Sequence, residues 1–172
     1  MRHFLALLLI LPLAACKEDQ AAIPDPIPLT VEAVSYFCQM NVLEHGGPKA
    51  QVHLEGLPAP LFFAQVRDAV AYLKSEERDR RVAMTYVSDM GQATSWNEPG
   101  ENNWTSAADA FFVIGAGVRG GMGAPEIVPF ATRESAEAFV VQYGGTITTL
   151  NDIPNDTVLG PVDLAQVLEE PA

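Results

Sequence analysis

Two stretches of the chain have the apolar spacing of amphipathic helices, and their sequences resemble each other. Residues 63–72 (FAQVRDAVAY) align without gaps on residues 130–139 (FATRESAEAF), with four identical positions and an aromatic residue at the end of both. Apolar side chains recur every three or four residues in each, which is the period of a helix with one buried face. This match predicts an internal duplication, although two packed helices can share such a composition for reasons of packing alone.

The segments around the two helices predict the same order of elements in both halves. A candidate strand follows each helix, and two extended segments joined by a glycine-bearing loop precede it. In the first half these segments are residues 31–37, 50–54 and 82–87, with the loop at 38–49; in the second half they are residues 110–114, 126–128 and 146–150, with the loop at 115–124. The order predicts an α+β fold of duplicated ββαβ-type units, with one helix packed on each mainly antiparallel sheet.

These elements divide the folded region into two repeats, at about residues 29–88 and 105–152, joined by a connector rich in Asn, Glu, Gly and Pro. The connector region carries Trp96 and Trp104. We expect Trp104 in the core, whereas Trp96 suits either the core or a partner contact. After the second repeat, residues 163–170 predict a short acidic helix.

The N-terminus predicts export and a lipid anchor. Residues 1–15 have a basic start, an apolar run too short to span a membrane and small residues at the end, which is the pattern of a cleaved signal. The tetrad that ends in Cys16 resembles a bacterial lipobox; the alternative is an ordinary secretory signal. Residues 16–28 alternate proline with other residues and predict an extended tether. The domain then occupies residues 29–172, including the acidic tail.

Charge and cysteine content narrow the function. Lys and Arg number 10 against 22 Asp and Glu, for a formal net charge of -12. Because nucleic-acid binding depends on clustered cations, this balance argues against it. Two cysteines are too few for a disulfide scaffold or an all-cysteine zinc site. If Cys16 carries lipid, Cys38 is the only thiol of the exported chain, and it is either buried and inert, mispaired or held by a metal.

A soft donor pair follows the first predicted strand. Cys38 and Met40 are two residues apart at the predicted strand end, where alternation would point both side chains to the same side. Thiolate and thioether ligands suit Cu(I), whereas Zn(II) rarely accepts methionine and Mg(II) or Ca(II) prefers oxygen. The pair therefore predicts a Cu(I) site, against the alternative that Cys38 is a small buried hydrophobe.

Two residues are candidates for a third copper ligand. His45 lies in the same loop, followed by glycines that let the backbone fold back, although it could simply form a hydrogen bond within the loop. Met122 lies between glycines in the loop expected to be equivalent in the second half, where a core role is poor. Of the other donors, we expect His53 to face solvent and Met84 to lie in the core, with Met90 a reserve.

Enzyme signatures are missing from the sequence. There is no Gly-x-Ser-x-Gly elbow, no His-Glu-x-x-His pair and no phosphate-binding glycine loop in a βαβ context. His45 could act as a base for Cys38, but no third residue to orient it is evident. The sequence therefore predicts a binding protein rather than an enzyme.

The motifs together resemble a known family, the lipoprotein copper chaperones of nitrous oxide reductase assembly (NosL). The resemblance rests on the lipobox, on residues 36–45 (YFCQMNVLEH) with the following GPKAQV, on residues 63–72 and on the GMGA loop at 121–124, and it covers nearly the whole exported chain. Family members usually have glycine where Gln39 stands, which leaves the ligands intact but changes the freedom of the loop. The family's fold is similar to a duplicated ββαβ arrangement.

The resemblance implies a membrane-anchored Cu(I) carrier on the periplasmic side of a bacterial membrane. Cys38 and Met40 would be copper ligands, with Met122 and His45 as the further candidates, and Cys16 would be the lipidated residue. The implied partners are apo nitrous oxide reductase and its ABC-type maturation complex. The competing hypothesis is an anchored adaptor for protein interactions, in which Cys38 is structural and binds no metal.

Overall fold

The computed structural model describes residues 23–162 of the 172-residue chain. The predicted signal, Cys16 and the predicted acidic helix at 163–170 lie outside the described residues. Within 23–162, no helix is long and apolar enough to cross a bilayer.

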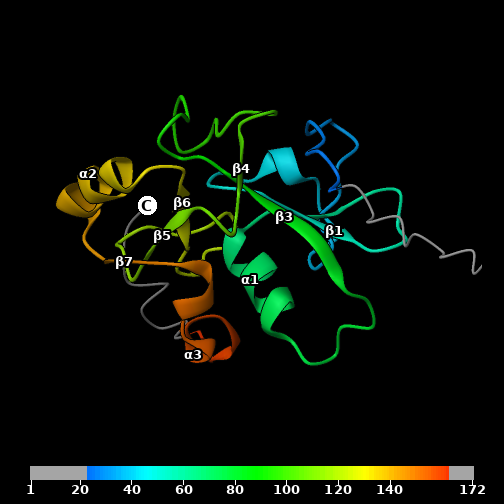
Figure 1. Ribbon diagram of the computed structural model, residues 1–172. Coiled ribbons are helices and arrows are strands. Elements are labelled where there is room, and N and C mark those ends of the chain that lie inside the picture. Colours follow the sequence, from blue (N-terminus) through cyan, green and yellow to red (C-terminus); the bar gives the residue numbers. More distant parts are fainter. Residues whose placement is uncertain (1–22, 163–172) are drawn as a thin grey trace, which may run out of the picture.

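The two halves of the chain have the same topology. The first contains β1 (Ala50–Leu54), β2 (Leu61–Phe63), α1 (Val66–Lys74) and β3 (Val82–Ser88); the second contains β5 (Phe111–Ile114), β6 (Val128–Phe130), α2 (Arg133–Tyr143) and β7 (Thr146–Thr148). In each half the first strand lies between the other two and pairs antiparallel with both, giving the orders β2-β1-β3 and β6-β5-β7. The predicted α+β fold of duplicated ββαβ units is confirmed, and Figure 1 shows the two sheets side by side with α1 and α2 in separate halves.

The predicted strand at residues 31–37 is wrong. This segment forms turns and two isolated bridges, Val34 to Asn41 and Ser35 to Phe62, and the short helix η1 (Val42–Glu44) follows it. The true counterpart of β5 is β1, so the loop 38–49 precedes the repeat instead of lying inside it. The loop that carries Met122 corresponds to residues 55–60, and the predicted equivalence of the loops 38–49 and 115–124 is also wrong.

The first sheet is extended beyond the repeat. A fourth strand, β4 (Trp104–Ser106), pairs with β3 at the end of the predicted connector. Trp104 is half-buried and packs against a small apolar cluster that includes Leu29 and Val42. The core placement expected for Trp104 is therefore confirmed in part, at the edge of the sheet.

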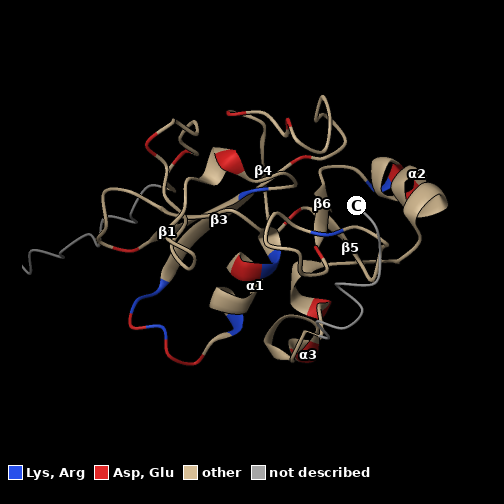
Figure 2. Cartoon of the chain, turned by 180° about the vertical axis from the view of Figure 1, so that it is seen from behind, with Lys and Arg blue, Asp and Glu red and all other residues tan. Residues whose placement is uncertain are grey.

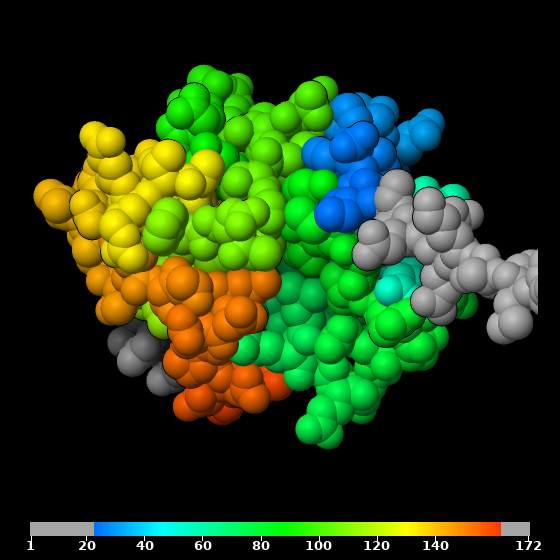
Figure 3. Space-filling view, viewed as in Figure 1, coloured from blue at the N-terminus to red at the C-terminus, as the bar shows by residue number. Residues whose placement is uncertain are grey.

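One apolar core joins the two repeats. Val52, Phe63 and Val70 from the first repeat pack in the same cluster as Phe112 and Ile127 from the second. The space-filling view shows the halves in contact, with the orange segment that leads into α3 (Asn155–Leu159) against the green of α1 (Figure 3). The Arg67 guanidinium also donates a hydrogen bond to the carbonyl of Thr157, which fastens α1 to α3. The repeats therefore fold around shared apolar side chains and are not independent domains.

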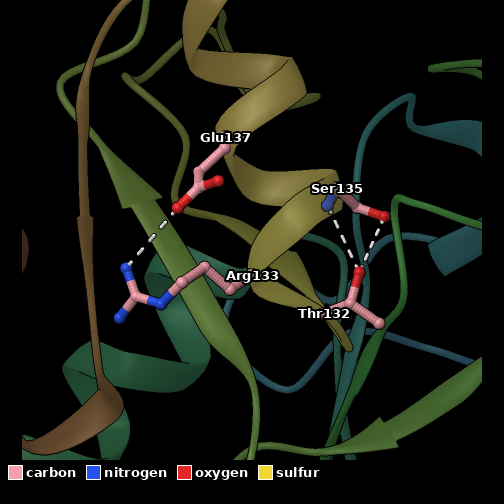
Figure 4. A network of polar contacts seen from close by, with 4 residues as sticks. All are labelled: Thr132, Arg133, Ser135 and Glu137. Atoms are coloured by element: carbon pink, nitrogen blue, oxygen red, sulfur yellow. Dashed lines mark hydrogen bonds and ion pairs between the residues drawn. The ribbon is translucent and has the colours of Figure 1, made fainter.

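The two long helices begin in different ways. In α2 the side chain of Thr132 accepts a hydrogen bond from the backbone N–H of Ser135 at 3.2 Å, and the two hydroxyls also bond (Figure 4). Helix α1 follows Gln65, whose side chain makes no such cap. Because the first N–H groups of a helix need acceptors, α1 must obtain one from elsewhere, and it does so from the second repeat, as described below.

Charge is unevenly distributed over the described residues. Acidic side chains are scattered, whereas basic side chains concentrate at the end of α1, at Lys74, and in the loop between α1 and β3, which carries Arg78, Arg80 and Arg81 (Figure 2). Acidic neighbours are interleaved there, and Arg81 pairs with Glu55 at 2.8 Å with both side chains exposed. Exposed pairs of this kind add little stability.

Candidate metal centre

Cys38 lies in a tight turn and not at a strand end. The N–H of Gln39 donates to the carbonyl of Ser35 at 2.9 Å, and the N–H of Ser35 donates to the carbonyl of Met40 at 2.9 Å. Gln39 has φ 58°, a left-handed conformation that glycine adopts most readily. The alternation argument that placed Cys38 and Met40 on one side of a strand is therefore wrong, because a turn joins them.

The thiol turn is open to solvent. Cys38 is a free, half-buried cysteine, and the side chain of Met40 is 43% exposed. Tyr36 and Phe37, also about half exposed, pack edge-on against the buried ring of Phe63, with centroids 6.0 and 5.4 Å away. These aromatic contacts anchor the turn on the core and leave Cys38 and Met40 partly exposed.

The same turn is bonded to the end of β2. The N–H of Tyr36 donates to the carbonyl of Phe62 at 2.7 Å, and the N–H of Ala64 donates to the Ser35 hydroxyl at 3.2 Å. Ser35 is fully buried. These hydrogen bonds hold the turn that contains Cys38 against the junction between β2 and α1, which consists of Ala64 and Gln65.

His45 reaches the same junction through Lys49. The Lys49 ammonium, almost fully buried, donates to the carbonyls of His45 at 2.5 Å, Gly46 at 3.2 Å and Ala64 at 3.1 Å. The Nε2 atom of His45 is buried and has no hydrogen-bond partner among the described residues. A buried polar atom without a hydrogen-bond partner calls for an explanation. Coordination of a metal ion by this nitrogen would provide one.

Trp96 supports the His45 loop. Gly47 has φ 86°, its N–H donates to the carbonyl of Trp96 at 2.7 Å, and a Cβ on Gly47 would come within 3.0 Å of the indole ring. The glycine therefore allows both the left-handed turn and the close approach of the ring. The sequence left the role of Trp96 open, and the structure shows it half-buried against the loop that presents His45.

Met122 lies in a loop of the second repeat that contacts the His45 loop. Its side chain is 46% exposed, and its backbone N–H donates to the side-chain carbonyl of Gln65 at 3.2 Å. The preceding Gly121 lies so close to His45 that a Cβ on it would come 2.4 Å from the His45 Cβ. The loop of Met122 and the loop of His45 are thus in direct contact.

The three segments that carry the four candidate ligands therefore converge on one place. The turn of Cys38 and Met40, the loop of His45 and the loop of Met122 are each hydrogen-bonded to Ala64 or Gln65, directly or through a neighbouring residue. The sequence offered no signal for Gln65, whose apolar neighbours suggest only the start of a helix.

Glu126 and Lys49 are the buried charged groups of the region, and the sequence did not single out either of them. One carboxylate oxygen of Glu126 accepts from the N–H groups of Arg67 and Ile127, both at 2.9 Å, and supplies the acceptor that α1 lacks. Burial raises the pKa of Glu126 to about 8, against the opposing effect of these hydrogen bonds. Burial lowers the pKa of Lys49 to about 8, although Glu126 raises it.

The comparison with known proteins gives the family. The NosL family model matches residues 26–158. The chain belongs to the NosL family. It is 53% identical over 152 residues to a copper-binding lipoprotein NosL of Achromobacter cycloclastes, covering 88% of this chain and 79% of that one. A second relative, the copper-binding lipoprotein NosL of Stutzerimonas stutzeri, is 28% identical over 152 residues, covering 87% and 77%.

Solved structures of NosL proteins share the fold. The crystal structure of a copper chaperone NosL from Shewanella denitrificans has a TM-score of 0.70 at 28% identity, covering 75% of this chain and 95% of that one. The solution structure of apo-NosL from Achromobacter cycloclastes has a TM-score of 0.50 at 52% identity, covering 66% and 91%. The family resemblance inferred from the motifs is thus confirmed.

The remaining sulfur and imidazole donors lie outside this NosL centre. His53 is buried on β1, where its Nε2 bonds the side-chain oxygen of Gln51 at 2.9 Å, so the solvent-facing position predicted for it is wrong. Met84 is half-buried and lines a hollow between α1 and β3, and Met90 packs on the second core cluster. In residues 23–162, no three His, Cys, Asp or Glu side chains form a metal-binding group.

Proposed function

We propose that this protein is an exported, lipid-anchored metallochaperone that binds Cu(I) and delivers it during maturation of nitrous oxide reductase. The proposal rests on the meeting, at the junction of β2 and α1, of the three segments that carry Cys38, Met40, His45 and Met122, together with the buried, unpartnered Nε2 of His45. The names of the NosL relatives, copper-binding lipoprotein and copper chaperone, support the choice of metal.

The chemistry of these donors favours Cu(I). A cysteine thiolate and methionine thioethers are soft ligands, which prefer Cu(I) to hard cations. Structural zinc sites take four Cys, His or carboxylate ligands, and the described residues offer no such cluster. Cys38 supplies the negative charge, Met40 the second sulfur, and His45 or Met122 completes a centre of low coordination.

Exposure of the donors suits a carrier better than a store or an enzyme. Because Met40 and Met122 are nearly half exposed, a partner's ligands can approach the metal and replace these donors one at a time. Exposed apolar side chains border the thiol turn, namely Val31, Val34, Tyr36 and Phe37. Such a patch favours docking of a partner, for which we propose apo nitrous oxide reductase and its ABC-type maturation complex, on the periplasmic side of the membrane.

The test is a Cu(I) titration against a competing chelator, with the exported chain carrying Cys16→Ser so that it stays soluble. We expect one tightly bound Cu(I) per chain, lost in Cys38→Ala and weakened in Met40→Ala. Met84→Leu, which changes a methionine in β3 outside the centre, is the matched control and should bind as the unmodified chain does. Unchanged stoichiometry in Cys38→Ala would refute the proposal.

The same experiment addresses the competing adaptor hypothesis, which the exposed apolar patch beside Cys38 also fits. An adaptor with a structural cysteine would bind Cu(I) weakly or not at all, and Cys38→Ala would change its folding stability instead. Retained binding of the maturation complex by a chain that cannot hold copper would favour the adaptor.

A further inference from the structure

Two buried side chains of opposite charge type, Lys49 and Glu126, lie beneath the loops that carry the candidate ligands. Lys49 is 1% exposed and Glu126 is 2% exposed. They come from different repeats, Lys49 from the residue before β1 and Glu126 from the approach to β6. Charged residues are almost never fully buried without a specific partner, so their position calls for a physical explanation.

Lys49 binds the His45 loop to the first repeat. Its ammonium has three hydrogens, and each has a backbone carbonyl as acceptor: those of His45, Gly46 and Ala64. The cation is therefore fully bonded without a carboxylate. Because two of the three carbonyls belong to consecutive loop residues, moving Lys49 would move the backbone that presents His45.

Glu126 packs against the Met122 loop and links it to the first repeat. One of its carboxylate oxygens caps α1 through the N–H of Arg67. The other, Oε2, has no partner in the described part of the chain, and it lies 2.5 Å from the position of a Cβ on Gly120. The side-chain oxygen of Gln65, which accepts the N–H of Met122, lies 2.3 Å from that same position. Glu126 and Gln65 thus enclose Gly120, two residues before Met122.

The two loops also contact each other, since Gly121 packs directly on His45. The loops therefore have little freedom to move independently, and Glu126 and Lys49 interact electrostatically across the boundary between the repeats. Bonds on both sides of the boundary determine how far Met122 lies from His45.

We propose that Lys49 and Glu126 are positioning residues for copper, a buried pair that fixes the separation of the His45 and Met122 loops so that the segment before the first repeat and the second repeat both present donors to one Cu(I). This inference rests on the proposed function. It assigns the packed fold a role in metal binding: the segment before the first repeat supplies the thiolate, the second repeat supplies an exposed thioether, and the buried pair sets their spacing. Groups that orient metal ligands typically change metal affinity about 10- to 100-fold when they are removed.

The test compares the Cu(I) affinity of variants of the soluble full-length exported chain. Glu126→Ala removes the cap of α1 and the wall beside Gly120, and we expect about a tenfold weaker affinity. Glu126→Gln keeps a carbonyl for the two N–H groups and should recover most of that affinity. Glu76→Ala, at an exposed glutamate in the loop between α1 and β3, is the control and should leave the affinity unchanged.

A double-mutant cycle separates positioning from general stability. If Glu126 acts through the Met122 loop, Glu126→Ala should have almost no further effect on Cu(I) affinity in a Met122→Ala background. Likewise, Lys49→Met should weaken binding in the unmodified chain but not in a His45→Ala background. X-ray absorption should show fewer sulfur neighbours around copper in Glu126→Ala, a change that a loss of folding stability alone does not produce.

Several outcomes overturn the inference while leaving the proposed function intact. Wild-type affinity in Glu126→Ala, or losses that add fully in the double variants, would show that the pair does not position the ligands. If Glu126→Ala does not fold, Glu126→Asp, which is shorter by one methylene, takes its place with the same expectation. Failure of the unmodified chain to bind Cu(I) at all would refute the proposed function itself.

Discussion

Replacing Glu126 by glutamine should change the pH dependence of stability in a predictable direction. The carboxyl group is fully buried, and its Oε1 accepts two backbone N–H groups while its Oε2 has no partner. Burial raises its pKa from 4.5 to about 8. In the unfolded chain the same group ionises near its ordinary pKa, so the folded state holds a proton that the unfolded state releases across this interval.

The sign and size follow from proton linkage. Because the folded pKa is raised, the contribution of Glu126 to stability is fully present below about pH 4.5 and is lost as the pH rises towards about 8. Each unit of this interval is worth about 1.4 kcal/mol, so between about pH 5 and pH 7.5 the free energy of unfolding should fall by about 3 kcal/mol on account of this one group. Lys49 acts at higher pH and with the opposite sign, because its lowered pKa makes stability increase from about pH 8 upwards.

The assay is chemical denaturation of the unmodified chain and of Glu126→Gln at about pH 5 and about pH 7.5, with the difference between the two proteins as the measured quantity. Groups that do not interact with Glu126, such as His53 with its lowered pKa, cancel in this difference. We expect the variant to lose about 3 kcal/mol less than the unmodified chain over this range. An exposed control, Glu98→Gln, should behave as the unmodified chain does. The same pH dependence in Glu126→Gln and the unmodified chain would refute the buried, protonated state of Glu126.

Three further changes test local features of the fold. Thr132→Ala removes the cap of α2 and should lower the free energy of unfolding by about 1 kcal/mol in denaturant titrations, with Thr132→Ser retaining it. Gly121→Ala places a methyl group against His45 and should cost about 1–3 kcal/mol and weaken Cu(I) binding; Gly117→Ala, with 3.8 Å of clearance, is the control. Gln39 has φ 58°, so the Gln39→Val variant should be less stable than the Gln39→Gly variant by about 1–2 kcal/mol in thermal unfolding. Equal stability of the two variants would contradict the left-handed turn.

Local periodicity accounts for what the sequence predicted correctly. Helix α1 buries a face that recurs every three or four residues, α2 packs Ala136, Phe139 and Val140 on the second core cluster at the same spacing, and β1 is a continuous buried run bounded by turn residues. Such patterns depend on neighbours within a few positions, so they can be recognised from the sequence alone. The duplicated topology followed from them because the same order of patterns occurs twice.

The errors occurred where distant residues decide the conformation. Residues 31–37 have the composition of a strand, but the chain turns at Gln39 and bonds back to Phe62 and Ala64. Lys49 is an ordinary surface residue by type, yet one of its acceptors lies 15 residues away. Glu126 caps a helix 59 residues earlier in the chain. Contacts of this range leave no periodic signal.

Candidate ligands were easier to predict than the scaffold that brings them together. Cys38, Met40, His45 and Met122 are recognisable by their chemistry, because soft donors in glycine-bearing loops are unusual. The meeting of the three segments that carry them depends on the amide side chain of Gln65 and on the close approach of Gly121 to His45. Neither is visible until the two repeats are packed together.

The attachment of residues 24–27 to the first sheet limits where this protein can work. The Tyr86 hydroxyl donates to the carbonyl of Pro24 at 2.9 Å, and Ile27 exchanges two hydrogen bonds of 3.0 Å with the side chain of Gln51. If Cys16 carries the lipid, residues 16–23 are all that separates the lipid from the first residue bonded to the sheet. Eight residues span at most roughly 28 Å. The proposed recipient of the copper would then have to come to the membrane surface or already reside there.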